Sequence, residues 1–197
     1  MRRHSSVADR RSRDTSLDIT AYLRDIARTF KNYKALADAA MAQVPTDADL
    51  HTQLDADSNS IAVIVKHVAG NLRSRYRDFL TTDGEKPDRN RDNEFEMPEQ
   101  ASRSDVLTWW NEAWAIALAS IEALTPEDLD RTVTIRGEGF LVVEALNRSA
   151  AHTAYHVGQI VYLARHLASP NWNSLSIPKG GSAAVARGDF KARGIVR

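Results

Sequence analysis

Three of the six histidines are the residues of this chain best suited to chemistry. His152 and His156 are four residues apart in the segment HTAYH, so on a helix both imidazoles project from one face, one turn apart. His67 lies at the margin of the apolar stripe of another predicted helix. Three neutral imidazoles from two helices can hold a metal ion and leave one coordination position for water or substrate. This pattern favours a site for chemistry or ligand binding over a structural metal.

Simpler interpretations of the histidines stay open. Pairs at i and i+4 also occur by chance, and His67 alone could be a core-edge histidine that hydrogen-bonds a neighbour such as Asn71. The residues between the pair are Thr153, Ala154 and Tyr155, which exclude the HExxH arrangement of zincins and its glutamate base. The spacing by itself therefore leaves metal binding and ordinary packing as alternatives.

Two glycines lie within one helical turn of these candidate ligands. Gly70 and Gly158 each fall inside a predicted helix, where glycine is less favourable than alanine by about 1 kcal/mol. Close approach of the second and fourth helices would explain both glycines. Local flexibility or a kink is the alternative.

Four segments with helical periodicity must position the histidines, because their apolar residues recur every three or four positions. They extend from Leu17 to about Val44, from Ser58 or Asn59 to about Leu80, from Ser102 or Ser104 to about Leu124, and from about Val142 to Leu167. Residues 45–58 and 81–101 are predicted to be connectors. Residues 132–135 and 140–141 are predicted to pair as a small hairpin around a turn at 137–139. We predict an all-α fold, a four-helix bundle with a small β-hairpin before the last helix.

Composition excludes several kinds of protein. The chain has 197 residues and no cysteine, so it has no disulfide, no cysteine-ligated metal and no thiol nucleophile of its own. Lys plus Arg and Asp plus Glu each total 26, which argues against a dedicated nucleic-acid or membrane-surface binder. No apolar run approaches the roughly 18 residues of a membrane helix. We therefore expect a cytoplasmic protein without a membrane or nucleic-acid partner.

The balanced charge is unevenly distributed. Residues 1–14 carry five arginines and two aspartates, and residues 181–197 carry four basic side chains and one aspartate, so each end has a net charge of +3. Residues 15–180 therefore carry −6, and we predict that they form one helical domain between a disordered basic N-terminal tail and a C-terminal tail. Organelle targeting or RNA contact is the alternative for the N-terminal tail.

The segments IVKHVAGN and HTAYHVGQI together resemble the DinB-like (DinB/YfiT-like) superfamily of metal-binding four-helix bundles. The stretch from Asn59 to Glu96 and the segment WNSLSIPKGGSAA look like its DUF1572 branch, and the resemblance covers roughly residues 17–185. It implies a homodimer in which His67, His152 and His156 hold a divalent ion, zinc or nickel. Relatives in the superfamily include transferases that use bacillithiol, mycothiol or glutathione, a maleylpyruvate isomerase, and metal-linked hydrolases.

Other polar residues are candidates for supporting catalysis or binding substrate at such a site. Asn71, Tyr155 and Gln159 lie near the histidines and could support catalysis, although each could equally be an ordinary helix-surface or half-buried residue. Arg89 and Arg91, in the 81–101 connector, could receive an anionic substrate group, or could pair with acidic residues of their own loop.

These observations lead to a functional hypothesis. We favour a metal-dependent enzyme that performs thiol-dependent S-transfer or hydrolysis on a small molecule. A divalent metal ion would be its cofactor, and because the chain has no cysteine, any thiol would enter as a cosubstrate. The alternative is a non-catalytic helical bundle that binds a metal or small ligand in a stress response.

Overall fold

The computed structural model describes residues 19–98 and 101–183. The tail predicted over residues 1–14 lies outside them, as does most of the one predicted over 181–197. The helices and strands, in chain order, are α1 (Ile19–Met41), α2 (Asp47–Leu50), α3 (Ile61–Tyr76), α4 (Arg103–Glu122), β1 (Thr132–Ile135), β2 (Glu138–Leu141) and α5 (Val142–Ala168), with short 3-10 turns at Asp92–Phe95 and Pro126–Asp128. The predicted mostly helical fold with a hairpin before the last helix is confirmed.

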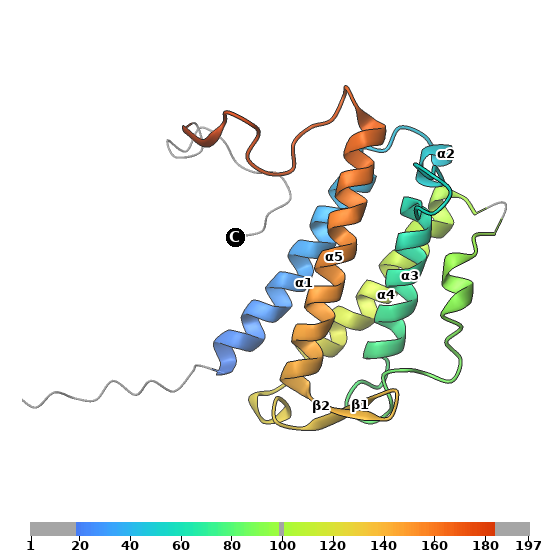
Figure 1. Cartoon of the computed structure of the whole chain (residues 1–197). Coiled ribbons are helices and arrows are strands. Elements are labelled where there is room, and N and C mark those ends of the chain that lie inside the picture. The colour runs from blue at the N-terminus through green and yellow to red at the C-terminus, as the bar shows by residue number, and fades with distance from the viewer. Residues whose placement is uncertain (1–18, 99–100, 184–197) are drawn as a thin grey trace, which may run out of the picture.

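Four long helices lie side by side, and the hairpin β1–β2 closes one end of the group (Figure 1). Helix α3 packs against α4 and α5, and α1 packs against the same two helices. Helices α3 and α5 therefore contact each other although about 65 residues separate them in the chain. Among the described helices, none combines the length and apolar character that crossing a membrane requires.

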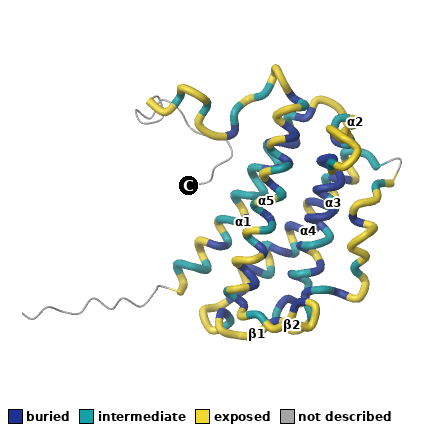
Figure 2. Tube along the Cα trace, in the orientation of Figure 1, coloured by how far each residue is buried: buried dark blue, intermediate teal, exposed yellow. Residues whose placement is uncertain are grey.

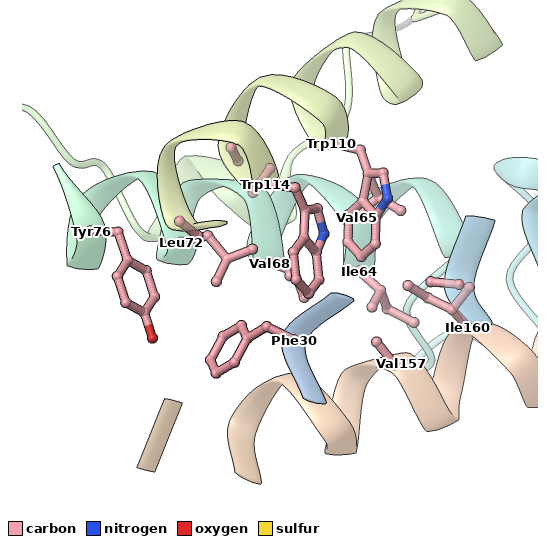
Figure 3. Close-up of a cluster of buried hydrophobic side chains, with 14 of the residues drawn as sticks. Phe30, Ile64, Val65, Val68, Leu72, Tyr76, Trp110, Trp114, Val157 and Ile160 are labelled. Atoms are coloured by element: carbon pink, nitrogen blue, oxygen red, sulfur yellow. The ribbon is translucent and has the colours of Figure 1, made fainter. Parts of the chain in front are cut away.

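Aromatic side chains from three helices fill the core (Figure 3). Phe30 of α1 makes edge-on contacts with Tyr76 and Trp114, at centroid distances of 5.9 and 6.1 Å. Trp110 is fully buried and donates its indole N–H to Asp38 at 2.7 Å. Because each of these large side chains is removed from water by neighbours on other helices, they fix how the helices pack.

Helix α3 is buried along most of its length, whereas the other helices alternate between buried and exposed faces (Figure 2). It begins at Ser60, whose hydroxyl accepts a hydrogen bond from the backbone N–H of Val63. It ends at Tyr76 rather than at the predicted Leu80, because Asp78 has a φ of +50°, in the left-handed region. A side chain on this helix is thus largely desolvated, which matters for His67.

Two local features differ from the sequence prediction. The 45–58 connector contains the one-turn helix α2, which is stabilised by a reciprocal capping box between Thr46 and Asp49. The hairpin turns at Arg136 and Gly137, which have φ values of +56° and +77°, while Gly139 lies within β2 opposite Thr134. The predicted turn at 137–139 was therefore displaced toward the C-terminus.

The hairpin turn is attached to the loop that follows α3. The carboxylate of Asp83 accepts hydrogen bonds from the backbone N–H groups of Arg136 and Gly137, at 2.9 and 2.8 Å, and from that of Glu85. These bonds to the charged form lower the pKa of Asp83 to about 2. Asp83 thus fixes the hairpin and the 81–97 loop relative to each other at one end of α3.

Candidate metal centre

The three histidines converge on one point between α3 and α5. Nε2 of His152 lies 3.4 Å from Nε2 of His67 and 3.2 Å from Nε2 of His156. In a tetrahedral site with Zn–N distances of about 2.0–2.1 Å, two nitrogens are separated by about 3.3–3.4 Å. The two observed separations are close to the spacing that a shared zinc ion would impose.

The outer nitrogens of two of these rings are held by hydrogen bonds. Nδ1 of His67 lies 2.8 Å from the carboxylate of Glu94, and Nδ1 of His156 lies 2.8 Å from the side-chain oxygen of Gln159. Since both partners accept, each ring carries its proton on Nδ1 and directs the lone pair of Nε2 inward. This arrangement of an acceptor behind each ring is the one found behind metal-bound histidines.

Burial keeps His152 and His156 neutral. Desolvation, with a smaller contribution from the neighbouring His156 and His67, lowers the pKa of His152 to about 4. The pKa of His156 is also lowered, chiefly by burial. At neutral pH both imidazoles are therefore unprotonated, which is the form that coordinates a metal.

Glu94 is the acidic residue at the centre, and it comes from the loop rather than from a helix. Arg89 donates from Nε and Nη2 to its two oxygens, at 2.7 and 2.9 Å. Burial raises the pKa of Glu94, but the hydrogen bonds from His67 and Arg89 outweigh that effect and hold its pKa below the usual value. Glu94 is thus a buried carboxylate shared between an arginine and a candidate ligand.

The short turn that carries Glu94 also places Phe95 on His67. The two rings are nearly parallel, tilted by 30°, with centroids 5.0 Å apart. Phe95 itself is partly exposed, so it separates His67 from solvent on that side. The loop therefore fixes His67 both at its edge, through Glu94, and across its face.

Gly70 makes this contact with the loop possible. A β-carbon at residue 70 would lie 2.3 Å from Oε1 of Glu94, which is an impossible contact. Glycine is thus required here by the approach of the loop, and not by the approach of α5. At Gly158 an added β-carbon would meet no described atom within 4 Å, so close packing does not explain that glycine.

A cavity of about 210 Å³ lies beside His67 and His152, between α3, α5 and the hairpin. Five arginines line it: Arg75, Arg89, Arg91, Arg136 and Arg148. A larger cavity of about 300 Å³ lies across α3, against α4, and none of the three histidines lines it. Chemistry at the histidines would therefore take place in the smaller, arginine-lined cavity.

The candidate residues from the sequence take different positions around the histidines. Asn71 lines the cavity one turn after His67. Gln159 binds His156 as described above, and Tyr155 is 64% exposed with its ring edge-on to that of His156. Arg89 and Arg91 both line the cavity, but Arg89 is buried and bound to Glu94, whereas Arg91 lies over the ring of Phe95.

Four residues of the site were not identified from the sequence: Glu94, Arg75, Arg136 and Arg148. A signal existed for two of them, because Arg148 precedes His152 by four residues and Arg75 follows Asn71 by four. That spacing places each on the helix face that carries the histidines. Glu94 and Arg136 depend on the folds of the loop and the hairpin turn, so no local pattern marks them.

Comparison with known proteins identifies the family of this chain but gives no activity for it. The family model DUF1572, described as a protein of unknown function, matches residues 18–181. That range contains every helix and strand described above and all three histidines. No curated protein and no solved structure matches the chain.

Proposed function

The chain belongs to the DUF1572 family, and from its site we propose that it is a metal-dependent enzyme acting on a small molecule. His67, His152 and His156 hold one divalent ion, zinc or nickel. In this proposal the four long helices form the four-helix bundle of the DinB-like superfamily, and the protein is a homodimer in the cytoplasm.

The inward-facing nitrogens are the observation that supports the proposal. With the protons of His67 and His156 on Nδ1, their Nε2 atoms can only accept, yet both lie within 3.4 Å of Nε2 of His152. A single Nε2–H on His152 can donate well to only one of them, so a lone pair would remain buried without a donor. A cation at the centre satisfies all three nitrogens.

When bound, a divalent ion would supply Lewis-acid chemistry, because it lowers the pKa of a bound water toward 7 or deprotonates a bound thiol, and either product is a nucleophile. The residues of the chain orient the histidine rings and the substrate. Glu94 and Gln159 hold the rings of His67 and His156, and Tyr155 packs against His156 from the solvent side. Asn71, in the cavity wall, offers an amide to polar groups of a substrate.

The reaction class that we propose is thiol-dependent S-transfer or hydrolysis. The chain has no cysteine, so the thiol in S-transfer is a low-molecular-weight cosubstrate. The cavity beside His67 and His152 provides the space in which such a molecule meets the substrate.

Metal analysis of purified protein tests the metal site. We expect about one divalent ion per chain in the wild type and a marked loss in His67→Ala and His152→Ala. His166→Ala is the matched control, because His166 is an exposed histidine near the C-terminal end of the same helix α5. Equal metal content in all four proteins would contradict the proposal.

Turnover assays then test the enzyme proposal. The metal-loaded protein is incubated with a panel of electrophiles and esters, with and without added thiols. Consumption that requires thiol indicates S-transfer, and consumption without thiol indicates hydrolysis. A metal-loaded protein that is inactive with the whole panel would favour the non-catalytic alternative.

A further inference from the structure

The cavity beside the histidines has more positive charge than its own carboxylates balance. Arg75, Arg89 and Arg136 share one carboxylate, that of Glu85, at 3.2–3.3 Å. The second carboxylate in contact with these arginines is Glu94, which Arg89 binds. Arg91 pairs with Asp92, and Arg148 is the fifth arginine of the cavity. Among the described residues, five guanidinium groups are therefore matched by three carboxylates, which leaves two positive charges over.

Arg75 is the clearest sign of a missing partner. Its side chain is only 13% exposed, and among the described residues its Nη1 is a buried atom that makes no hydrogen bond, although it lies 3.3 Å from Glu85. Burial lowers the pKa of Arg75, and although Glu85 raises it, the nearby Arg89, Arg136 and Arg148 lower it in turn. A buried guanidinium nitrogen without an acceptor is costly, and native structures seldom leave one unsatisfied.

Arg148 points to the same conclusion from the other side of the cavity. Its guanidinium lies over the ring of Phe140, 5.4 Å from the centroid, and it forms no ion pair with any described residue. It precedes His152 by four residues on α5, which corresponds to a rise of about 6 Å along the helix. A group held by Arg148 is therefore one helical turn from the proposed metal ligands.

From these contacts we infer that the cavity binds the carboxylate or phosphate group of a small anionic substrate or cosubstrate, held by Arg75 and Arg148 with Arg136 at the rim. Guanidinium groups bind such oxyanions through paired N–H donors. A volume of about 210 Å³ is below that of pockets for drug-sized ligands, so the molecule is small. That the bound anion is a substrate rests on the proposed function. That the cavity binds an anion does not depend on it.

Calorimetric titration of the metal-free protein, prepared with a chelator, tests the anion site without involving the metal. The probes are inorganic phosphate, succinate and the neutral analogue succinamide. We expect the wild type to bind phosphate and succinate saturably. Binding should be at least about tenfold weaker in Arg148→Gln and in Arg75→Lys. Arg75→Lys keeps the positive charge but loses the paired N–H donors of the guanidinium group. Succinamide should not bind measurably.

Arg165→Gln is the matched control, since Arg165 is an exposed arginine of α5 outside the cavity and the charge change is identical. Circular dichroism confirms that each variant is folded, and the exposed position of Arg148 makes its variant the decisive one. No anion binding by the wild type, equal affinity in Arg148→Gln and Arg165→Gln, or binding of succinamide as tight as that of succinate would each overturn the inference.

The two proposals fail separately. If the wild type binds phosphate through Arg148 but holds no metal ion, the enzyme proposal is overturned and the anion site stands. If the wild type holds one ion per chain but binds no anion in the chelated state, the anion site is overturned and the metal centre stands.

Discussion

The carboxylate of Glu94 occupies the space that a side chain at residue 70 would fill. The nearest oxygen is 2.3 Å from the position of a β-carbon on Gly70, while the other oxygen accepts the hydrogen bond from His67. The loop over α3 therefore reaches the histidine only because the helix has no side chain at that point.

Replacing Gly70 by alanine should weaken metal binding. The added β-carbon displaces Glu94, so His67 loses the acceptor that orients its ring, and loss of such a partner costs about 10–100-fold in metal affinity. The measurement is a competition titration with a chromophoric chelator.

Gly158→Ala is the control for that substitution. It adds the same methyl group inside the other helix of the site, where no described atom lies within 4 Å. Its metal affinity should be unchanged, and urea unfolding should show a gain in stability of up to about 1 kcal/mol. Equal metal affinities in the two variants would refute this role of Gly70.

Glu94→Gln should lower the free energy of unfolding by about 3 kcal/mol or more. The side chains of Glu94 and Arg89 are 7% and 4% exposed, and removing one charge of a buried pair is strongly destabilising. The other carboxylate in contact with Arg89 is that of Glu85, which Arg75 and Arg136 already share. Replacing both residues, as in Arg89→Met/Glu94→Leu, should restore part of the loss. A double variant less stable than Glu94→Gln in urea unfolding would contradict this account.

The stability of the metal-free protein should fall as the pH drops from about 6.5 toward 4. The pKa of His152 is lowered to about 4 in the folded protein, from an ordinary value near 6.5. Between those values the unfolded chain binds the proton and the folded chain does not, so acid favours unfolding. Urea unfolding at a series of pH values measures the effect.

His152→Asn isolates the contribution of that residue. The variant should show a smaller loss of stability over the same pH interval, because the remaining slope comes from other groups. A wild-type profile parallel to that of the variant between pH 4 and 6.5 would show that His152 does not titrate in this way.

Asp83→Ala should loosen the hairpin turn from the loop. Its carboxylate binds the backbone N–H groups of Arg136 and Gly137, which then lose their acceptors. Hydrogen exchange at these two amides should accelerate, whereas the exposed Asp130, replaced by alanine as a control, should leave them protected. Unchanged exchange in Asp83→Ala would rule out this attachment.

Local patterns were sufficient for the helices and for the histidines. The spacing of apolar residues predicted α1, α3, α4 and α5 to within a few residues, because every one of them buries apolar side chains at helical spacing. The four-residue spacing of His152 and His156 placed both on one face, and the structure brings His67 to the same point. Metal binding itself stays a prediction.

The rest of the site depends on contacts between distant segments. Nothing near Glu94 in the sequence indicates that it reaches His67, since that requires the loop to fold back over Gly70. The hairpin turn likewise formed at Arg136 and Gly137 because Asp83, more than 50 residues earlier, accepts their N–H groups. Such long-range interactions override local turn preferences.

His67 and His152 are separated by 85 positions in the chain, yet their Nε2 atoms are 3.4 Å apart. Bringing two such distant positions together costs conformational entropy of the chain between them. The packing of α3 against α5 offsets that cost when the protein folds. A cation that binds there would meet ligands whose approach the helix packing supports, so little further ordering of the chain would oppose its binding. Separate peptides of the two helices would lack that advantage.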